Sequence, residues 1–187
     1  MPARFRAIAT PLTGLWELER QPIGDERGFF ERLYCAEDLR GWGHPGMIVQ
    51  ANRSLTRRRG AVRGMHFQHA PHGEWKLITC LRGRVHDVIV DLRQGSTSLR
   101  QHHAVELSGE GHRTLLVPPG CAHGFQTLTA ECEMLYLHSH PYVSSAEGGV
   151  RPDDPTIAIA WPLDFTDLSE RDAHHPLLSA DYQGIAT

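Results

Sequence analysis

The sequence is poor in lysine, because Lys76 is the only one and every other basic side chain is arginine. It also lacks a strong net charge: 19 Lys and Arg stand against 22 Asp and Glu, giving −3 with neutral histidine. This balance excludes a general basic surface for nucleic acid, so we expect no nucleic-acid partner. Any site for an anionic ligand must be local.

Long apolar runs are absent as well. No segment approaches the roughly 20 apolar residues that cross a bilayer, and the first 20 residues lack the apolar stretch of a signal peptide. The four cysteines, Cys35, Cys80, Cys121 and Cys132, form no CxxC pair and no tight metal-binding spacing. We therefore expect a cytoplasmic protein with reduced thiols and no membrane association.

The sequence does contain many short apolar runs with strand character. A chain of 187 residues with 40% hydrophobic content has enough material for one core, so we expect a single domain, residues 1–187. The clearest runs are 46–55, 74–83, 84–93, 102–109, 113–120, 124–130 and 132–140. Their spacing and the intervening Gly and Pro turns predict an antiparallel sandwich or barrel. Helix is expected only in short flanking segments, at 36–42 and, after a serine cap, at 168–178.

The run VHDVIVDL has two different faces. Val85, Asp87, Ile89 and Asp91 lie on one face, whereas the face that begins at His86 is otherwise apolar. We therefore expect the second face to pack inward.

Lys76 follows His66 by ten residues in a segment rich in histidine. A chain so biased toward arginine keeps a lysine where a compact ammonium is needed, for example beside a developing oxyanion. Chance placement on a strand is the alternative.

Thirteen histidines raise the question of a metal. Gly60 with His66, and Pro118 and Gly120 with His123, resemble the two motifs of the cupin superfamily, which implies a double-stranded β-helix. The first motif would place a second histidine ligand where this chain has Gln68, and Glu74 lies outside the usual spacing. We therefore expect no metal.

A closer resemblance covers nearly the whole chain. Its segments are DERGFF, IVQANRS, VRGMHFQ, WKLITCLRGRVHDVIVDLR, PPGCAHGFQTL, MLYLHSHPY, EGGVRPDDP, AIAWP and LSERDAHHPLL. Together they resemble the RmlC family of dTDP-4-dehydrorhamnose 3,5-epimerases and related nucleotide-sugar epimerases. The resemblance implies a mainly β cupin jelly roll that forms a homodimer, needs no metal or organic cofactor, and acts on a nucleotide-linked 4-keto-6-deoxyhexose, with dTDP favoured.

The chemistry of this reaction explains the residues that the resemblance supplies. A C4 ketone acidifies the hydrogens on C3 and C5, so inversion needs a base, an oxyanion stabiliser at O4 and an acid on the opposite face. The resemblance makes His66 the base, Asp172 its orienting partner, Tyr136 the acid and Lys76 the stabiliser. Judged without it, Asp172 is a charged residue in a helical turn and Tyr136 a core aromatic.

Further residues are implied to bind the substrate. Arg27 and Arg63 match positions that hold the pyrophosphate, where a guanidinium makes paired charge-assisted hydrogen bonds. Gln50, Asn52 and Glu147 are expected to contact nucleotide or sugar hydroxyls. His123 is placed in the same cavity, with a structural histidine as the alternative.

Recognition of the base is the weakest part of the resemblance. Arg32 and Ala51 stand where the family commonly has acidic residues, and Pro141 and Pro152 stand where it often has aromatic ones. Tyr142 is a candidate to replace the lost stacking surface. The reaction class is therefore a firmer prediction than the nucleotide, and the sequence leaves open whether C3, C5 or both are inverted.

Two hypotheses from other classes remain. A metal-dependent cupin enzyme, such as a dioxygenase or isomerase, would use His66, His69 or His123 as ligands. A non-catalytic protein that binds nucleotide sugars would keep the cavity without needing the acid and the base.

Overall fold

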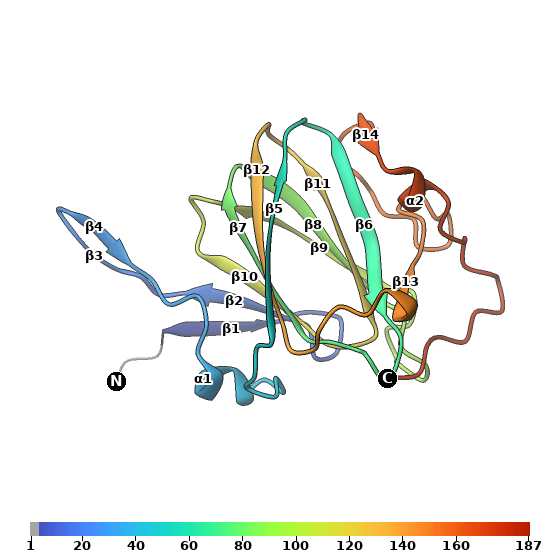
Figure 1. Ribbon diagram of the computed structural model, residues 1–187, viewed down its shortest axis with the longest axis horizontal. Coiled ribbons are helices and arrows are strands. Elements are labelled where there is room, and N and C mark those ends of the chain that lie inside the picture. Colours follow the sequence, from blue (N-terminus) through green and yellow to red (C-terminus); the bar gives the residue numbers. More distant parts are fainter. Residues whose placement is uncertain (1–3) are drawn as a thin grey trace.

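Two antiparallel sheets face each other in the computed structural model, which describes residues 4–187 (Figure 1). The strands are β1 (Phe5–Ala9), β2 (Trp16–Arg20), β3 (Ile23–Asp25), β4 (Gly28–Phe30), β5 (Gln50–Thr56), β6 (Ala61–Gln68), β7 (Lys76–Arg82), β8 (Arg84–Asp91), β9 (His102–Ser108), β10 (Arg113–Val117), β11 (Cys121–Thr127), β12 (Cys132–His138), β13 (Glu147–Gly149) and β14 (Asp167–Leu168). The helices are α1 (Ala36–Arg40), α2 (Glu170–Ala173) and the 3-10 turn η1 (Ser144–Ala146).

The first sheet has the order β1-β2-β10-β7-β12-β5, and the second has the order β13-β6-β11-β8-β9. Strands β5, β7, β8, β9, β10, β11 and β12 coincide with the predicted runs to within a few residues. The mainly β jelly roll with short flanking helices is therefore confirmed. One end of the space between the sheets is filled by apolar side chains, and the other end is a cavity.

The orientation predicted for β8 is wrong. Val85 and Ile89 belong to the core between the sheets, whereas Val88 and Val90 pack outward against the C-terminal segment, including Ile157. Both faces are buried because residues 150–185 cover the outside of the second sheet (Figure 1). The face that carries Asp87 therefore points between the sheets.

The N-terminal part extends the first sheet and then leaves it. Strand β2 pairs with both β1 and β10, and strands β3 and β4 form a separate hairpin that projects from the body (Figure 1). Ile23, Phe29 and Phe30 on this hairpin are 51%, 66% and 71% exposed. These apolar side chains have little of this chain to pack against.

Helix α2 begins as the sequence predicts. Ser169 is its N-cap, and its side-chain oxygen accepts a hydrogen bond from the backbone N of Asp172 at 3.1 Å. Just before it, β14 pairs in parallel with β6. The C-terminal helix is thus fixed beside the strand that carries His66.

Two sequence predictions concern the environment of the chain. Within residues 4–187, no helix has the length and apolar composition needed to cross a membrane. All four cysteines are unpaired, and burial raises the pKa of Cys80 and of Cys121 to about 12. These two thiols therefore stay protonated and inert at neutral pH.

Candidate active site

A cavity of about 550 Å³ lies between the two sheets at the end closed by α2. It gathers nine of the eleven residues predicted for the site: His66, Lys76, Tyr136, Asp172, Arg63, Asn52, His123, Glu147 and Tyr142. They come from β5, β6, β7, β11 and β12, from the 141–147 segment and from α2. Residues far apart in sequence therefore share one pocket because the jelly roll brings both sheets to it.

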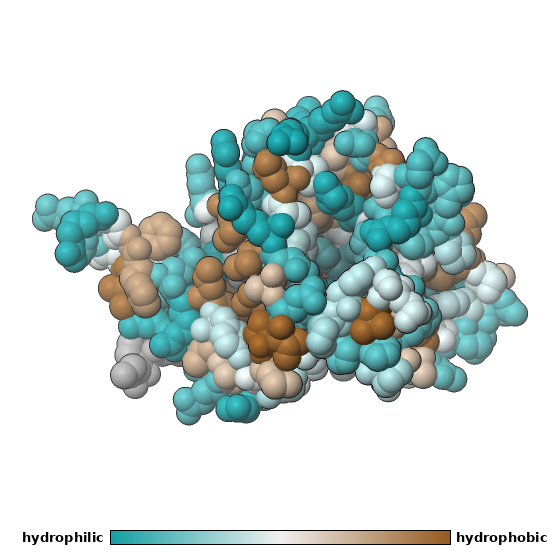
Figure 2. Space-filling model, viewed as in Figure 1, coloured by the Kyte–Doolittle hydropathy of each residue, from teal (hydrophilic) through white to brown (hydrophobic). Residues whose placement is uncertain are grey.

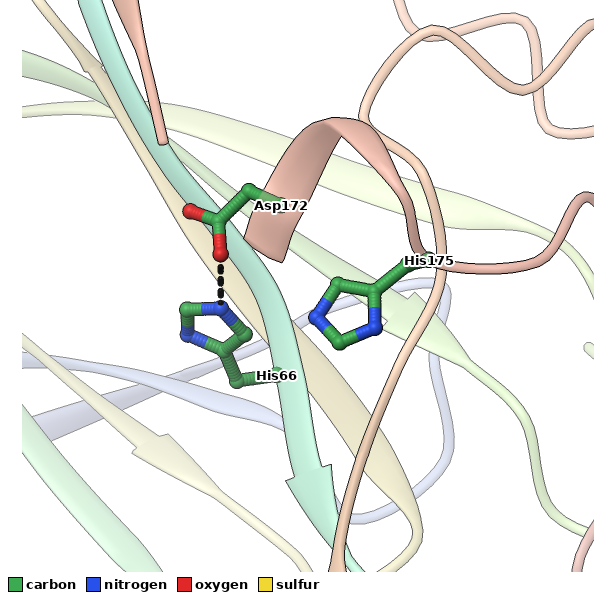
Figure 3. A group of neighbouring side chains, drawn as sticks. All are labelled: His66, Asp172 and His175. Carbon is green, nitrogen blue, oxygen red and sulfur yellow. Dashed lines mark hydrogen bonds and ion pairs between the residues drawn. The ribbon is translucent and has the colours of Figure 1, made fainter. Parts of the chain in front are cut away.

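His66 and Asp172 form a close pair (Figure 3). The Nε2 atom of His66 lies 2.8 Å from Oδ1 of Asp172, and Oδ2 of Asp172 accepts a hydrogen bond from the backbone N of Gly64 at 3.1 Å. Burial alone would raise the pKa of Asp172, but the hydrogen bonds from His66 and Gly64 hold this pKa well below its ordinary value. Asp172 is therefore an anchored carboxylate, and the second ring nitrogen of His66 is left for a ligand.

Gly64 allows this arrangement. Its φ of 132° is unfavourable for other residues, and a Cβ at this position would lie 2.5 Å from Cα of Gly124 on β11. The close approach of β6 and β11 next to His66 thus depends on Gly64 and Gly124.

Arg171 is a functional candidate that the sequence did not reveal. Its Nη1 atom lies 3.0 Å from both carboxylate oxygens of Glu147, and its Nη2 atom lies 3.2 Å from Nε2 of His66. The side chain is 55% exposed and lines the cavity. Its position directly before Asp172 in a short helix was the only available signal.

Lys76 lies at the start of β7 with its ammonium group directed to the cavity. Nζ donates to the carbonyl oxygen of His66 at 3.1 Å and lies 3.1 Å from Oε1 of Glu74. An ammonium has three donors, so within residues 4–187 one remains for a ligand. The positive charge and the base are therefore linked through the backbone of β6.

Tyr136 reaches the cavity from β12, in the sheet that faces His66. Its hydroxyl lies 3.4 Å from Oγ of Ser54. Burial raises the pKa of Tyr136 above its ordinary value, and the hydrogen bond to Ser54 only partly offsets this effect. The phenol is thus protonated at neutral pH and can act as a proton donor.

His123 on β11 is held by a buried carboxylate. Its Nε2 atom lies 3.0 Å from both oxygens of Asp87, which is fully buried on β8. His123 is the register partner of His66 on the neighbouring strand, and its ring packs edge-on against Tyr136. The site therefore contains a second anchored histidine, and Asp87 was not among the predicted residues.

Four predicted binding residues lie at or near the opening of the cavity, which we call its mouth. Arg63 donates Nε to Oγ1 of Thr56 at 2.9 Å and has no ion-pair partner within residues 4–187. Tyr142 is 52% exposed and donates its hydroxyl to Glu147 at 2.9 Å. Asn52 lines the cavity, whereas Gln50 does not. The Oε1 atom of Gln50 instead accepts a hydrogen bond from the backbone N of Tyr142 at 2.9 Å. Gln50 therefore positions the loop that presents Tyr142.

Arg27 is not in the cavity of its own chain. It lies at the tip of the β3–β4 hairpin, 89% exposed, and pairs with Asp25. Figure 2 shows the hairpin with a hydrophilic tip and hydrophobic side chains closer to the body. Arg27 therefore does not line the cavity of its own chain, and its contact with the pyrophosphate stays a prediction.

The histidine ligands considered for a metal are not brought together. Among the described residues, the one group with spacing for a metal ion is His66, Asp172 and His175, whose ligand atoms lie within 4.8 Å of one another (Figure 3). His69 packs against Phe67 instead, and His123 binds Asp87. The guanidinium of Arg171, 3.4 Å from Oδ1 of Asp172, already supplies positive charge at the His66 group, so the donor set fits a base dyad better than a cation site.

Comparison with known proteins agrees with this geometry. The family model described as dTDP-4-dehydrorhamnose 3,5-epimerase matches residues 9–180. The chain belongs to this family. A dTDP-4-dehydrorhamnose 3,5-epimerase of Streptomyces griseus is 43% identical over 165 residues, which cover 87% of this chain and 82% of the relative.

Two solved structures in the comparison carry informative ligands. A 3,5-epimerase from Legionella pneumophila in complex with dTDP-4-keto-L-rhamnose has a TM-score of 0.87 and 34% identity, covering 98% of this chain and 99% of that one. A 3′-monoepimerase from Streptomyces bikiniensis in complex with dTDP-quinovose has a TM-score of 0.84 and 32% identity, covering 90% and 85%.

Membership in the dTDP-4-dehydrorhamnose 3,5-epimerase family confirms the predicted family, fold class and enzyme class, a carbohydrate epimerase. The reaction assigned from the sequence, inversion of a nucleotide-linked 4-keto-6-deoxyhexose, is confirmed at the level of this family.

Proposed function

We propose that this epimerase inverts C3, C5 or both of a dTDP-linked 4-keto-6-deoxyhexose through an enolate, with His66 as the base and Tyr136 as the acid. The observation that carries the proposal is the placement of these two side chains on facing sheets of one cavity, beside the only lysine. A substrate between the sheets would present one face of its ring to the imidazole and the other to the phenol. Inversion requires this arrangement, because the proton leaves one face and returns to the other.

The first step is removal of the proton on C3 or C5. His66 accepts it on the ring nitrogen that does not face Asp172, and the anchored carboxylate stabilises the imidazolium that forms. The electron pair moves to O4 of the ketone, where the free donor of Lys76 stabilises the oxyanion. Tyr136 then donates its proton to the carbon from the opposite side.

Nucleotide binding is assigned to the residues at the mouth. Arg63 has no ion-pair partner within residues 4–187 and offers its guanidinium to a pyrophosphate, and Tyr142 offers an exposed ring on which a base can stack. Asn52 and Glu147 supply polar contacts, and His123 supports the enolate site. Relatives that bind dTDP ligands support thymidine as the base. Pro152 is buried and does not line the cavity, so it offers no stacking surface to the base.

A homodimer is part of the proposal. The β3–β4 hairpin projects from the body with three exposed apolar side chains, so a second copy gives them a partner. The hairpin of that copy would deliver Arg27 to the pyrophosphate next to Arg63. This explains why Arg27 does not contact the cavity of its own chain.

The domain and location predictions stay proposals as well. One domain, residues 1–187, is supported because β1 and β2 extend the same sheet as β7 and β12, while α2 lies against β6. A cytoplasmic location is supported by the four unpaired thiols.

The test is mass spectrometry of dTDP-4-keto-6-deoxyglucose incubated with the protein in D2O. Enzyme-dependent uptake of two deuteriums indicates exchange at C3 and C5, and uptake of one indicates a single-centre enzyme, as for the 3′-monoepimerase relative. His66→Ala and enzyme-free samples are the controls. Absence of uptake in the wild-type sample, with the ligand shown to bind, would refute catalysis and favour a protein that only binds nucleotide sugars.

A further inference from the structure

Glu74 is a buried carboxylate with no role in the steps above. It precedes β7 and is 6% exposed, and its Oε1 atom lies 3.1 Å from Nζ of Lys76, which is itself 8% exposed. A buried carboxylate is costly unless a cation and further hydrogen bonds compensate for lost hydration. The position of Glu74 is therefore determined by Lys76 and by one other partner.

That partner is Gln68, the residue at the cupin ligand position. Its amide nitrogen has two hydrogens to donate, and the acceptors within hydrogen-bonding distance are Oε2 of Glu74, the carbonyl oxygen of His72 at 3.1 Å and that of Pro141 at 3.2 Å. The Oε1 atom of Gln68 accepts a hydrogen bond from the backbone N of Val143 at 2.6 Å. Gln68 thus fixes the Glu74 carboxylate and, at the same time, the loop that carries Tyr142.

We propose that Glu74 is a positioning residue that supplies the counter-charge of Lys76 and aims the free N–H of Lys76 at O4 of the substrate. The inference rests on the proposed function, because it gives Lys76 the oxyanion. Two of the three ammonium donors are occupied, by Glu74 and by the carbonyl of His66, and their directions fix the third. A lysine without these partners would rotate about four bonds.

Glu74 supplies the negative charge that lies beside the ammonium of Lys76. His138 is the register partner of Lys76 on β12, and burial together with the Lys76 charge lowers the pKa of His138 to about 4, so that it stays neutral. Within residues 4–187, the titratable groups near Lys76 include Glu74, His138 and Cys121, and His66 and His123 line the same cavity. Among residues 4–187, Glu74 is the one carboxylate in direct contact with the ammonium.

The single lysine makes the proposal directly measurable. Protein labelled with lysine carrying 13C at the ε position has one labelled side chain, so one NMR resonance reports the ionisation of Lys76 against pH. In Glu74→Gln, the amide keeps hydrogen-bonding atoms but removes the counter-charge. We expect this variant to lose the Lys76 proton at a pH at least about one unit lower than the wild type.

The matched control is Glu106→Gln on β9, which makes the same change in a residue paired with Arg84 at the surface. Its Lys76 resonance should titrate as in the wild type. Identical titration midpoints for Glu74→Gln and the wild type would overturn the proposal. If Glu74→Gln does not fold, Glu74→Asp keeps the charge but retracts it by one methylene, so the midpoint should fall by less and kcat should drop; wild-type values of both would overturn the proposal.

Activity supplies the second readout. In Glu74→Gln, the alkaline limb of the kcat profile should move to lower pH by the same shift as the resonance, with KM unchanged. A purely structural role would lower kcat equally at every pH. The NMR titration needs no substrate, so a failed epimerase assay in the wild type would refute the proposed function and leave the ionisation result standing.

Discussion

The side chain at position 172 must be charged and not merely an acceptor of hydrogen bonds. Asp172 holds His66 at 2.8 Å and carries a pKa well below its ordinary value. In Asp172→Asn, an amide replaces the charge that stabilises the imidazolium during proton abstraction. We expect kcat to fall by about 10³-fold or more with little change in KM, measured by steady-state kinetics on dTDP-4-keto-6-deoxyglucose. Unchanged turnover would remove Asp172 from the base dyad.

Tyr136 tests the other face of the substrate. Because burial keeps its phenol protonated, Tyr136→Phe removes the acid while leaving the base intact. We expect product formation to fall by about 10²-fold or more, while exchange of the proton that His66 removes continues in D2O. Mass spectrometry and product analysis on the same sample separate the two processes. Equal loss of exchange and inversion would show that Tyr136 is needed earlier, for binding or enolate formation.

Residue types revealed the active site only where they were unusual or matched a family motif. The single Lys76 stood out by composition, and the resemblance supplied His66, Tyr136 and Asp172. Asp87 and Glu74 were not predicted as site residues, because the residue type alone does not show whether a carboxylate is buried or solvated. Only the fold shows which of the acidic residues are surrounded by protein.

At the scale of elements, the short helix α2 determines where Asp172 lies. Ser169 caps it through the backbone N of Asp172, so Ser169→Ala should lower the free energy of unfolding by about 1 kcal/mol. Because the cap and the dyad share Asp172, kcat should fall as well. Urea denaturation and kinetics check both effects, with Ser145→Ala in an exposed turn as the control. A stability loss without a change in kcat would separate the cap from the catalytic geometry.

Strands with clear apolar runs were predictable, and others were not. The runs that became β7, β8 and β12 stood between Gly and charged turns, so their bounds were close to those observed. Strand β8 was oriented wrongly because residues 150–185 cover its outer face, and a strand buried on both sides loses the alternation that shows direction. The β3–β4 hairpin was not predicted, since its apolar side chains stay largely exposed and Phe29 packs edge-on against His112 and not into the core.

For the whole molecule, stability should decrease toward acid pH. Burial lowers the pKa of His138 from 6.5 to about 4, and burial also lowers the pKa of His44, His86 and His175. The unfolded chain therefore binds more protons than the folded one in this range, and the stabilisation present above pH 6.5 is lost as the pH falls toward about 4. Thermal unfolding between pH 4 and 8 measures this, and His138→Gln should flatten the decrease.

The proposed exchange of hairpins makes a prediction that involves both subunits. If Arg27 acts in the cavity of its partner, Arg27→Ala and His66→Ala each inactivate a homodimer, by losing the pyrophosphate contact or the base. A mixed dimer then contains one site with both defects and one with neither, since the His66→Ala subunit lends its intact Arg27 to the intact His66 of the other. Unfolding and refolding equal amounts of the two variants together should restore about one quarter of wild-type activity, because half of the dimers are mixed and each has one good site.

Size-exclusion chromatography with light scattering verifies the dimer. Failure of the mixture to regain activity in confirmed dimers would show that Arg27 does not cross between subunits, and the exposed Phe29 and Phe30 would then need another partner.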